Sequence, residues 1–517
     1  MRHVPRPLSF LPYFPRAMLF RQIVDDQLAQ HAYLVGCPDA GEALVVDPER
    51  DIDRYLDAAA REGLEITAVA ETHIHADFLS GARELAEETG ATVYLSAHGA
   101  PQGPQGTRED GSYRWGEGYD ARFLEDGDTL TVGSVELRAL HTPGHTPEHV
   151  SFLVTDGESD GETPMGLLSG DFVFVGDTGR PDLLETAAGE EGAAAEGARA
   201  LFGSVQRFLD MEDHLQVWPG HGAGSACGKA LGGVPETTVG YERRVSPAMQ
   251  AAQQGEQAFT DYVTSAQPEP PAYFARMKRL NRDGPPLLGA LPEPERFSES
   301  DLEALGPNGV GPNGSPTVID ARPDRSDFMR GHLPGALYAP FGKNFPTLAA
   351  SYADPDQPVV LVIAEEHVED ATRSLVRVGM DRVEGVASPQ ALAAYAESHG
   401  GALESLPVID MAEMDARRRG DGAQVLDVRS PDEYERGHVP GALLAPHTRL
   451  AERLGALPRD RTLLVHCGGG RRASSAASLL AARGFDAVHV DDRFSNWSEA
   501  HPDAVEPGPP SPEEAPA

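Results

Sequence analysis

The sequence predicts a multidomain α/β protein, and three observations support this fold class. A chain of 517 residues is too long for a single hydrophobic core, since one domain usually takes roughly 150 residues. From residue 18 to about residue 245, short apolar strand patterns alternate with helical stretches. The remaining sequence contains an internal repeat of about 100 residues, which indicates two further α/β domains.

The region before the repeat is expected to form one large domain and a linker. Residues 1–17 carry arginines and prolines without the apolar run of a secretory signal, so we expect a disordered N-terminal extension. Residues 18–250 combine strand patterns such as AYLVG and GEALVVDP with helical stretches such as GARELAEETG. A polar stretch marked by prolines follows, which predicts a linker over residues 251–290.

The internal repeat defines the second half of the chain. The segment VIDARPDRSDFMRGHLPGAL at 318–337 returns as VLDVRSPDEYERGHVPGAL at 425–443. A buried strand, a loop and a helix follow in both copies. We therefore expect domains of similar fold at 291–400 and 405–505, and a disordered tail at 506–517.

Charge and cysteine content restrict the partners and the compartment. The formal net charge is −38, from 81 acidic and 43 basic residues, so nucleic acid is not an expected partner. No run of about 18 apolar residues occurs, so no membrane partner is expected. Only three cysteines, Cys37, Cys227 and Cys467, are present, which argues against a disulfide framework and for a reducing, cytoplasmic compartment.

Three sequence elements have the residue types and spacing of a metal site. His73, His75 and Asp77 form a His-x-His-x-Asp motif at the end of an apolar strand, where the two imidazoles can converge on one ion. Pro-Gly-His at His145 and Ser-Gly-Asp at Asp171 follow later in the chain. Together the three elements indicate a metal centre far more strongly than any single histidine does.

In this order and spacing, the elements resemble those of the metallo-β-lactamase superfamily. The resemblance covers roughly residues 18–245 and implies an αββα sandwich with metal-binding loops along one edge. That superfamily mostly binds two metal ions through a His-x-His-x-Asp-His motif. Here Phe78 replaces the final histidine and offers no lone pair, so one ion is expected in place of a pair.

Within the superfamily, this region is most similar to the persulfide dioxygenases. The resemblance implies that His73, His145 and Asp171 hold one Fe(2+) per chain. Two histidines and one carboxylate leave open coordination positions, which suits the chemistry of non-haem iron with dioxygen. His75 and Asp77 match motif positions left off the iron and are expected to orient ligands or water.

Three further residues are expected near the pocket. His221, in a Pro-Gly-His-Gly loop, matches a second-metal ligand and is expected to form hydrogen bonds instead. Arg180 is expected to bind a carboxylate or phosphate of the persulfide carrier, with an ordinary surface ion pair as the alternative. Cys227 lies between glycines with a lysine nearby, which favours an accessible, reactive thiol over a buried, inert one.

A second reactive site is predicted where Cys467 follows a buried strand and precedes a helix. Its backbone nest and positive surroundings come from the following residues, Gly468, Gly469, Gly470, Arg471 and Arg472. The helix N-terminus and the arginines favour the thiolate, which can accept a sulfur atom and pass it to a nucleophile. With the LDVRSPDEYERGHVPGAL motif, the loop resembles the rhodanese family. In the first copy Glu365 aligns with Cys467, so that domain is expected to be a non-catalytic spacer or docking domain.

Together the two resemblances imply a persulfide dioxygenase fused to a sulfurtransferase. Its partners would be a small-molecule persulfide, O2 and sulfite, with Cys467 passing sulfane sulfur to sulfite to make thiosulfate. A zinc-dependent thioester hydrolase like glyoxalase II is one alternative, which Phe78 disfavours. A persulfide-sensing or sulfur-carrier scaffold with a structural metal is another. The carrier thiol and the oligomeric state, a homo-oligomer included, are left open.

Overall fold

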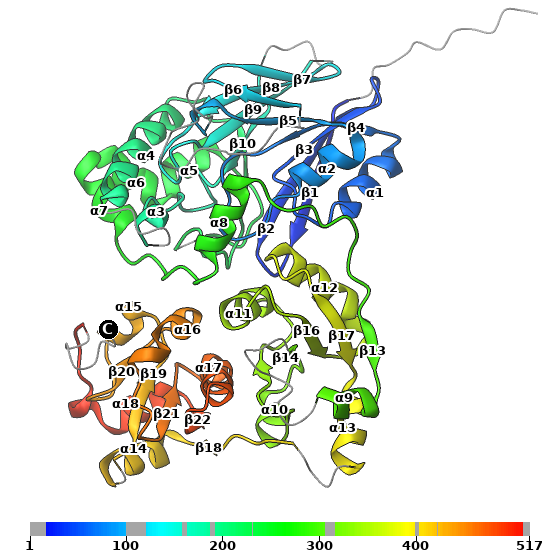
Figure 1. The fold of residues 1–517 in the computed structure, drawn as a ribbon. Helices are drawn as coiled ribbons and strands as arrows, with labels where there is room; N and C mark the ends of the chain where they lie inside the picture. The colour runs from blue at the N-terminus through cyan, green and yellow to red at the C-terminus, as the bar shows by residue number, and fades with distance from the viewer. Residues whose placement is uncertain are drawn as a thin grey trace, which may run out of the picture.

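The computed structural model describes residues 17–99, 120–157, 163–186, 192–229, 231–305, 316–398, 403–420 and 422–509. Four β-sheets organise these residues: two of six strands in the first domain and one of five strands in each of the next two (Figure 1). Most of the predicted N-terminal extension and C-terminal tail lies outside the described residues. No described helix has the length and apolar character needed to cross a lipid bilayer.

The first sheet of the N-terminal domain is mixed. Its strands are, in order, β1 (Leu19–Asp25), β2 (Gln30–Cys37), β3 (Glu42–Val46), β4 (Glu65–Ala70), β5 (Thr92–Ser96) and β6 (Ala121–Leu124). The pairs from β1 to β3 are antiparallel and those from β3 to β6 are parallel. Helices α1 (Asp53–Glu62) and α2 (Ala82–Thr89) cover one face, with a core between helices and sheet.

The second sheet faces the first across a shared core. Its strands are β7 (Thr129–Val132), β8 (Val135–His141), β9 (Val150–Asp156), β10 (Gly166–Gly170), β11 (Gln216–Pro219) and β12 (Thr237–Thr238). Buried side chains of both sheets, among them Val35, Leu44, Leu137 and Phe152, fill the space between them. The outer face is covered by α4 (Ala193–Leu209) and α6 (Pro247–Gln254), so the αββα sandwich is confirmed.

The predicted linker over residues 251–290 is largely helical, which corrects the interpretation of this stretch as a connector. Helix α7 (Glu256–Thr264) buries Phe259 and Val263 in the core that covers the second sheet. Helix α8 (Phe274–Asp283) packs against the loop that follows β4. These helices were not predicted because only one side of each contributes apolar residues to a core. The other side is polar, so the stretch resembles a connector in the sequence.

The two copies of the internal repeat form two parallel five-stranded sheets with the same topology. In the middle domain the order is β13 (Glu295–Phe297), β17 (Val383–Ala387), β16 (Val359–Val362), β14 (Thr317–Asp320) and β15 (Leu337–Tyr338). In the C-terminal domain it is β18 (Val408–Ile409), β22 (Ala487–Val490), β21 (Leu463–His466), β19 (Gln424–Asp427) and β20 (Leu443–Leu444).

Equivalent helices flank the two sheets. Those of the middle domain are α9 (Glu299–Leu305), α10 (Arg325–Arg330), α11 (Phe345–Tyr352), α12 (Val368–Arg377) and α13 (Pro389–Ser398). Those of the C-terminal domain are α14 (Met411–Gly420), α15 (Pro431–Glu435), α16 (Leu450–Arg453), α17 (Arg471–Ala482) and α18 (Phe494–Ala500).

The repeated sequence motif makes the same contacts in both domains. Arg322 pairs with Asp320 through both Nε and Nη2, and its Nη2 also donates to the carbonyl of Gly331, the glycine of the Gly-His pair. Arg429 does the same with Asp427 and the corresponding glycine. The repeat read from the sequence therefore preserves a buried ion pair as well as a strand order.

The middle domain docks onto the first domain through the arginines of α12. Arg377 contacts Asp51 at 2.6 Å and Asp25 at 3.0 Å, and all three side chains are buried. Arg373 binds Asp53 at 2.6 Å. Because buried charges are tolerated only when they are paired, this network fixes how the two domains meet.

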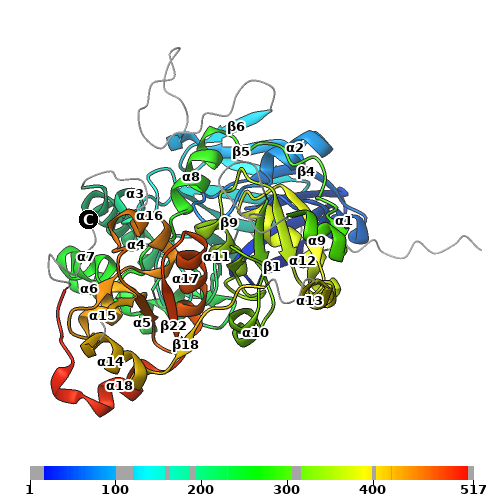
Figure 2. The ribbon, with the colours of Figure 1, turned by 60° about the horizontal axis from the view of Figure 1, so that its bottom comes forward.

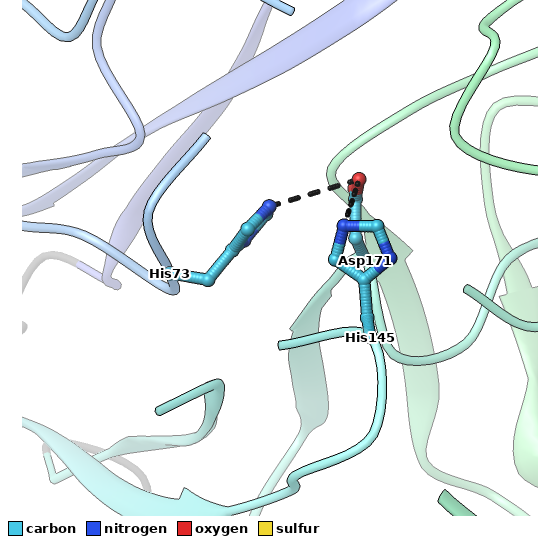
Figure 3. A group of neighbouring side chains, drawn as sticks. All are labelled: His73, His145 and Asp171. Atoms are coloured by element: carbon cyan, nitrogen blue, oxygen red, sulfur yellow. Dashed lines mark ion pairs between the residues drawn. The ribbon is translucent and has the colours of Figure 1, made fainter. Parts of the chain in front are cut away.

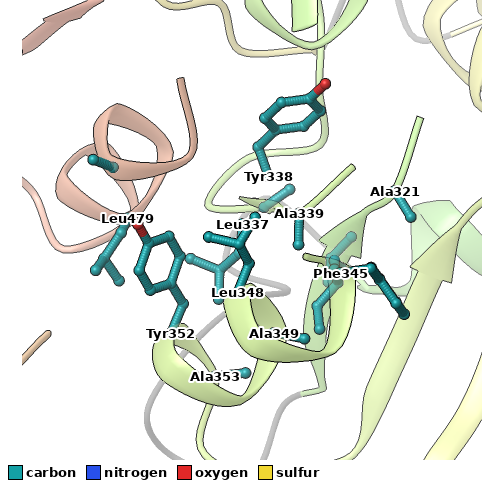
Figure 4. Packing of buried hydrophobic residues seen from close by; sticks show 14 of the residues in the cluster. Ala321, Leu337, Tyr338, Ala339, Phe345, Leu348, Ala349, Tyr352, Ala353 and Leu479 are labelled. Carbon is teal, nitrogen blue, oxygen red and sulfur yellow. The ribbon is translucent and has the colours of Figure 1, made fainter. Parts of the chain in front are cut away.

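The middle domain meets the C-terminal domain through an apolar surface (Figure 4). Leu337, Leu348 and Tyr352 of the middle domain lie beside Leu479 of α17, and all belong to one continuous hydrophobic cluster. The backbone N–H of Tyr338 donates to Ser478 Oγ at 2.8 Å. A second view also places α11 beside α17 (Figure 2). Thus the middle domain contacts both of the others, which also contact each other where Arg449 donates to the Thr186 carbonyl at 3.1 Å.

Candidate metal centre and sulfur-transfer loop

Three loops at one edge of the sandwich bring the candidate metal ligands together (Figure 3). His73 lies on the loop after β4, His145 on the loop between β8 and β9, and Asp171 directly after β10. All three side chains are buried. Residues separated by nearly 100 positions thus converge because their strands end at the same edge of the two sheets.

The distances within this group suit a single ion. His73 Nε2 lies 3.8 Å and His145 Nε2 lies 3.5 Å from Asp171 Oδ2, and the three candidate ligand atoms are all within 4.8 Å of one another. Metal–ligand bonds of roughly 2.0–2.2 Å place neighbouring ligand atoms about 3–4 Å apart. One ion can therefore contact all three side chains with little rearrangement.

The hydrogen bonds around the histidines leave the correct nitrogens free. Nδ1 of His73 is 2.9 Å from Thr72 Oγ1, whose own hydrogen goes to Asp47 Oδ2, so the imidazole donates through Nδ1. Nδ1 of His145 donates to the Arg180 carbonyl at 3.0 Å. Burial lowers the pKa of His145 to about 4 and that of His73 well below its usual value, so both rings are neutral at pH 7. Each Nε2 then presents a lone pair.

The two carboxylate oxygens of Asp171 have different surroundings. Its Oδ1 accepts from His221 Nδ1 at 2.7 Å. Its Oδ2 is buried and accepts no hydrogen bond from any residue in the described part of the chain. A buried carboxylate oxygen without a partner is costly, and beside two free imidazole nitrogens it fits a metal ion. The side chains of His73, His145 and Asp171 therefore fit a bound metal ion.

His221 bridges two carboxylates. Its Nε2 is 2.7 Å from Asp77 Oδ2, and its Nδ1 is 2.7 Å from Asp171 Oδ1. Burial opposes protonation, but the charges and hydrogen bonds of the two aspartates outweigh it and raise the pKa of His221 to about 10. Both nitrogens are thus engaged by carboxylates. Asp77, His221 and Cys227 also form a second group whose possible ligand atoms lie within 4.8 Å of one another.

His75 points to a separate buried group. Its Nε2 lies 3.1 Å from both Asp47 and Glu71, which hold the pKa of the ring well above its usual value although burial opposes the charge. The ring of Phe78 lies 4.3 Å from that of His75 and is fully buried. At the position of the missing histidine, the structure therefore places an apolar ring in contact with His75.

The Cys467 loop joins β21 to α17. Gly470 adopts a φ of +83°, a left-handed conformation that glycine reaches without strain, and a Cβ there would come within 2.1 Å of an Asp491 oxygen. Gly468 and Gly469 complete the turn, with Arg471 at the first position of the helix. The Cys467 side chain is buried at the positive end of the helix.

Arg472 connects this loop to the neighbouring helix α15. Its Nη2 lies 2.7 Å from Glu433 Oε1, and its guanidinium lies close enough to Cys467 to interact with it electrostatically. Burial opposes the charge of Arg472, but Glu433 and Cys467 raise its pKa. A fixed cation beside the sulfur stabilises a thiolate or a persulfide anion. In the middle domain, Glu365 is exposed and pairs with Arg296 at 2.7 Å.

Comparison with known proteins agrees with this geometry. The family model of the metallo-beta-lactamase superfamily matches residues 25–221, and that of the rhodanese-like domain matches residues 410–500. The crystal structure of a metallo-beta-lactamase from Staphylococcus aureus subsp. aureus COL is 38% identical, with a TM-score of 0.61, over 72% of this chain and 100% of its own. The chain belongs to the metallo-beta-lactamase superfamily. It carries a rhodanese domain after the metallo-beta-lactamase domain.

Curated relatives share part of their length with the chain. A beta-lactamase hydrolase-like protein of Xylella fastidiosa (strain 9a5c) is 27% identical over 58% of this chain and 65% of its own length. A hydroxyacylglutathione hydrolase of Polaromonas sp. (strain JS666 / ATCC BAA-500) is 33% identical over 37% of this chain and 60% of its own. The chain thus spans less than two thirds of the length of these two relatives.

Arg180 of the metallo-beta-lactamase domain is a buried structural residue. This corrects both predictions for it, which were binding of a substrate anion and an ordinary surface ion pair. The side chain is 1% exposed and grips Asp182 through Nε at 2.8 Å and Nη2 at 2.7 Å. Its Nη1 donates to the carbonyls of Ala226 and Pro268. The guanidinium is therefore neither on the surface nor free for a substrate anion. Its backbone carbonyl instead orients His145.

Cys227 is buried, so the predicted accessible thiol with a lowered pKa is wrong. Burial raises the pKa of Cys227 well above its usual value, and the nearby Asp77 and Asp171 raise it further. Lys229, which was expected to lower the pKa of Cys227, donates its Nζ to the carbonyls of Tyr262 and Ser265. The lysine is thus occupied elsewhere and the thiol faces carboxylates.

Asn281 of α8 is a site residue that the sequence did not reveal. Its Nδ2 donates to the carbonyls of His75 at 2.9 Å and Phe78 at 2.7 Å, and its Oδ1 accepts from the Ser80 N–H. These bonds fix the backbone of the metal loop. The residue lies about 200 positions away in the supposed linker, and a lone asparagine carries no motif, so no sequence signal pointed to it.

Proposed function

We propose that the chain is a mononuclear non-haem iron persulfide dioxygenase joined to a sulfurtransferase. The observation that carries the proposal is the cluster of His73, His145 and Asp171, beside which the apolar Phe78 stands at the position of the missing histidine. Fe(2+) held by two histidines and one carboxylate supplies dioxygen chemistry, with positions open for O2 and a thiolate-type substrate.

The residues of the metallo-beta-lactamase domain prepare this site. The hydrogen bonds from Nδ1 of His73 and His145 fix the tautomer and the ring orientation of both ligands. The imidazolium of His221 holds one oxygen of Asp171 and thereby directs the other oxygen toward the two imidazoles. The overall reaction is R–SSH + O2 + H2O → R–SH + sulfite + 2 H⁺, in which the terminal sulfur is oxidised and O2 is reduced.

The rhodanese domain performs the second step. The Cys467 thiolate attacks the terminal sulfur of a persulfide, the S–S bond breaks, and R–S⁻ leaves. The sulfur lone pair of sulfite then attacks the outer sulfur on Cys467, which releases thiosulfate and restores the thiolate. Arg472 stays beside the sulfur throughout and balances its negative charge.

A zinc thioester hydrolase fused to a sulfurtransferase is the second candidate. The 33% identity to a hydroxyacylglutathione hydrolase favours it. The apolar Phe78 ring opposes it, because it removes a ligand from a second metal position.

Substrate choice tests the proposal against this alternative. Protein prepared without oxygen and loaded with Fe(2+) should consume O2 with glutathione persulfide and should release sulfite. It should not hydrolyse a hydroxyacylglutathione thioester when loaded with Zn(2+). Thioester hydrolysis without persulfide-dependent oxygen uptake would favour the hydrolase and contradict the dioxygenase.

A further inference from the structure

All three domains line one cavity of about 390 Å³, here called the interdomain chamber. The first domain contributes Asp77 and Ala226, the middle domain Thr347 and Leu348, and the rhodanese domain His447 and Arg472. Its size lies within the range of pockets that hold small molecules. The proposed function assigns no role to it.

Part of the chamber wall lies close to the metal site, although no proposed metal ligand lines it. Asp77 lines the wall and is 2.7 Å from His221, which in turn is 2.7 Å from the proposed ligand Asp171. Ala226, beside Cys227, lines the same part of the wall. A molecule in this part of the chamber is therefore separated from the metal ligands by one layer of side chains.

Another part of the wall lies beside the sulfur-transfer loop. Arg472 lines the chamber and interacts electrostatically with Cys467. His447 lies next to it on the loop after β20, and burial together with the charge of Arg472 lowers the pKa of His447 to about 4. The ring is neutral at pH 7, and its buried Nδ1 has no hydrogen-bond partner among the described residues. This part of the wall thus presents the Arg472 guanidinium and the Nδ1 of His447.

A second cavity adjoins this part of the wall. It measures about 580 Å³, lies between the middle and rhodanese domains, and shares Asn344, Leu348, His447 and Arg472 with the interdomain chamber. His447 and Arg472 therefore stand at the junction of the two cavities.

The internal repeat indicates that His447 belongs to the active copy in particular. The segment Ala445-Pro446-His447 corresponds to Ala339-Pro340-Phe341 in the middle domain. The backbone follows the same course in both, since the N–H groups of Ala339 and Ala445 bond the equivalent aspartate carbonyls. The copy without the cysteine thus has an apolar ring where the active copy has an imidazole.

We propose that the interdomain chamber carries sulfite from the metal centre to the persulfide on Cys467, and that His447 and Arg472 receive it. The proposal rests on the proposed function. Sulfite is a small oxyanion, which Arg472 attracts and to which the neutral His447 ring can donate a hydrogen bond. Its sulfur then attacks the outer sulfur on Cys467, the S–S bond breaks, and the Cys467 thiolate leaves as thiosulfate forms.

An isotope-dilution experiment on the iron-loaded full chain tests this passage. The enzyme oxidises glutathione persulfide with isotopically labelled terminal sulfur, in the presence of excess unlabelled sulfite in solution. Direct passage predicts thiosulfate labelled at both sulfur atoms, well above the fraction that mixing with the added sulfite would give. A doubly labelled fraction equal to the mixing value would overturn the proposal, even if sulfite and thiosulfate were both produced.

Two variants and a matched control locate the passage. Thr347→Trp, which places a large ring in the chamber, should reduce double labelling to the mixing value. His447→Phe should have the same effect. Glu366→Trp, an exposed position of the middle domain that lines neither cavity, should retain the labelling of the wild type. Undiminished double labelling in both chamber variants would overturn the assignment of the route.

The same experiment distinguishes failure of the proposed function from failure of the direct passage of sulfite. If no sulfite forms and no oxygen is consumed, the proposed function fails and the passage fails with it. If sulfite forms but equilibrates with the solution before transfer, the dioxygenase and sulfurtransferase activities stand and only the passage is refuted.

Discussion

Individual residues around the metal centre divide the work of binding and orientation. Asp171 offers one carboxylate oxygen to the metal position and gives the other to His221. His221 in turn is held by Asp77. Two carboxylates and one imidazolium therefore form a chain that ends at a metal ligand, and the orientation of the ligand depends on groups that do not touch the metal.

Removal of His221 should weaken iron binding without abolishing it. His221→Ala leaves Asp171 Oδ1 without its charged donor, so the carboxylate loses its fixed orientation. We expect affinity for iron to fall about 10–100-fold, the usual effect of losing a residue that orients a ligand. Competition with a chelator measures it. An unchanged affinity would show that Asp171 is oriented by other contacts.

The ion pair between Glu433 and Arg472 makes the rhodanese loop sensitive to acid. Burial opposes ionisation of Glu433, but the hydrogen bond and charge of Arg472 outweigh it and lower the pKa from 4.5 to about 2. A lowered carboxyl pKa stabilises the folded state above pH 4.5, and this stability is lost as the pH falls toward 2. The pair therefore stabilises the loop at neutral pH.

Glu433→Gln should reveal this dependence in thermal unfolding. At neutral pH we expect the free energy of unfolding of the rhodanese domain to fall by about 1.5–3 kcal/mol, the range for hydrogen bonds to charged groups. The difference between variant and wild type should shrink as the pH is lowered through 4.5 toward 2. A difference that is constant over this range would mean that the ion pair does not stabilise the loop.

At the scale of elements, α12 and α17 show how one fold serves two purposes. Both follow the central strand of a parallel sheet. The N-terminus of α17 meets a glycine loop and Cys467, whereas α12 follows a loop with Glu365 and directs Arg373 and Arg377 at the first domain. The middle copy thus uses this helix for docking.

The arginines of α12 should matter for stability far more than exposed arginines of the same domain. Arg377→Met leaves Asp25, Glu49 and Asp51 buried without their shared partner, which should cost about 3–5 kcal/mol in unfolding free energy. Arg382→Met, which removes an exposed pair with Glu384, should cost about 0–1 kcal/mol. Equal effects in denaturant titrations would contradict the docking role.

The sequence predicted this level of structure well where spacing carries the information. Strand ends that present His73, His145 and Asp171 were recognisable from the three motifs, as was the repeat that gives two equal sheets. Burial and side-chain partners were not recognisable, because they depend on segments that are distant in sequence. Cys227, Arg180 and Asn281 were misjudged or missed for this reason.

At the scale of the whole molecule, the candidate metal centre and the Cys467 loop lie in different domains. Residues of all three domains line one cavity, the interdomain chamber. The middle domain binds the first domain by charge and the rhodanese domain by apolar packing. Thr347 and Leu348 of the middle domain line the interdomain chamber, whereas the α12 ion pairs line a separate cavity. A domain without a nucleophile can therefore determine how the two active domains face each other.

The two activities should be separable by one substitution. Cys467→Ser removes the sulfur acceptor, so transfer of sulfur to cyanide or sulfite should be lost while persulfide-dependent oxygen uptake is retained. In that background, Glu365→Cys should not restore transfer, because its exposed loop has neither the glycine turn nor the adjacent arginines. Recovered activity would show that the middle domain can act as a sulfurtransferase.

The identity and number of the bound metal test the central claim most directly. Protein purified without oxygen should contain about one iron per chain, since three ligands converge on one position and the apolar Phe78 stands where a ligand to a second would be. Metal analysis of the same sample that consumes oxygen with a persulfide measures it. One iron per chain in active protein is the result expected here. Two zinc ions per chain in active protein would contradict the assignment as a mononuclear iron dioxygenase.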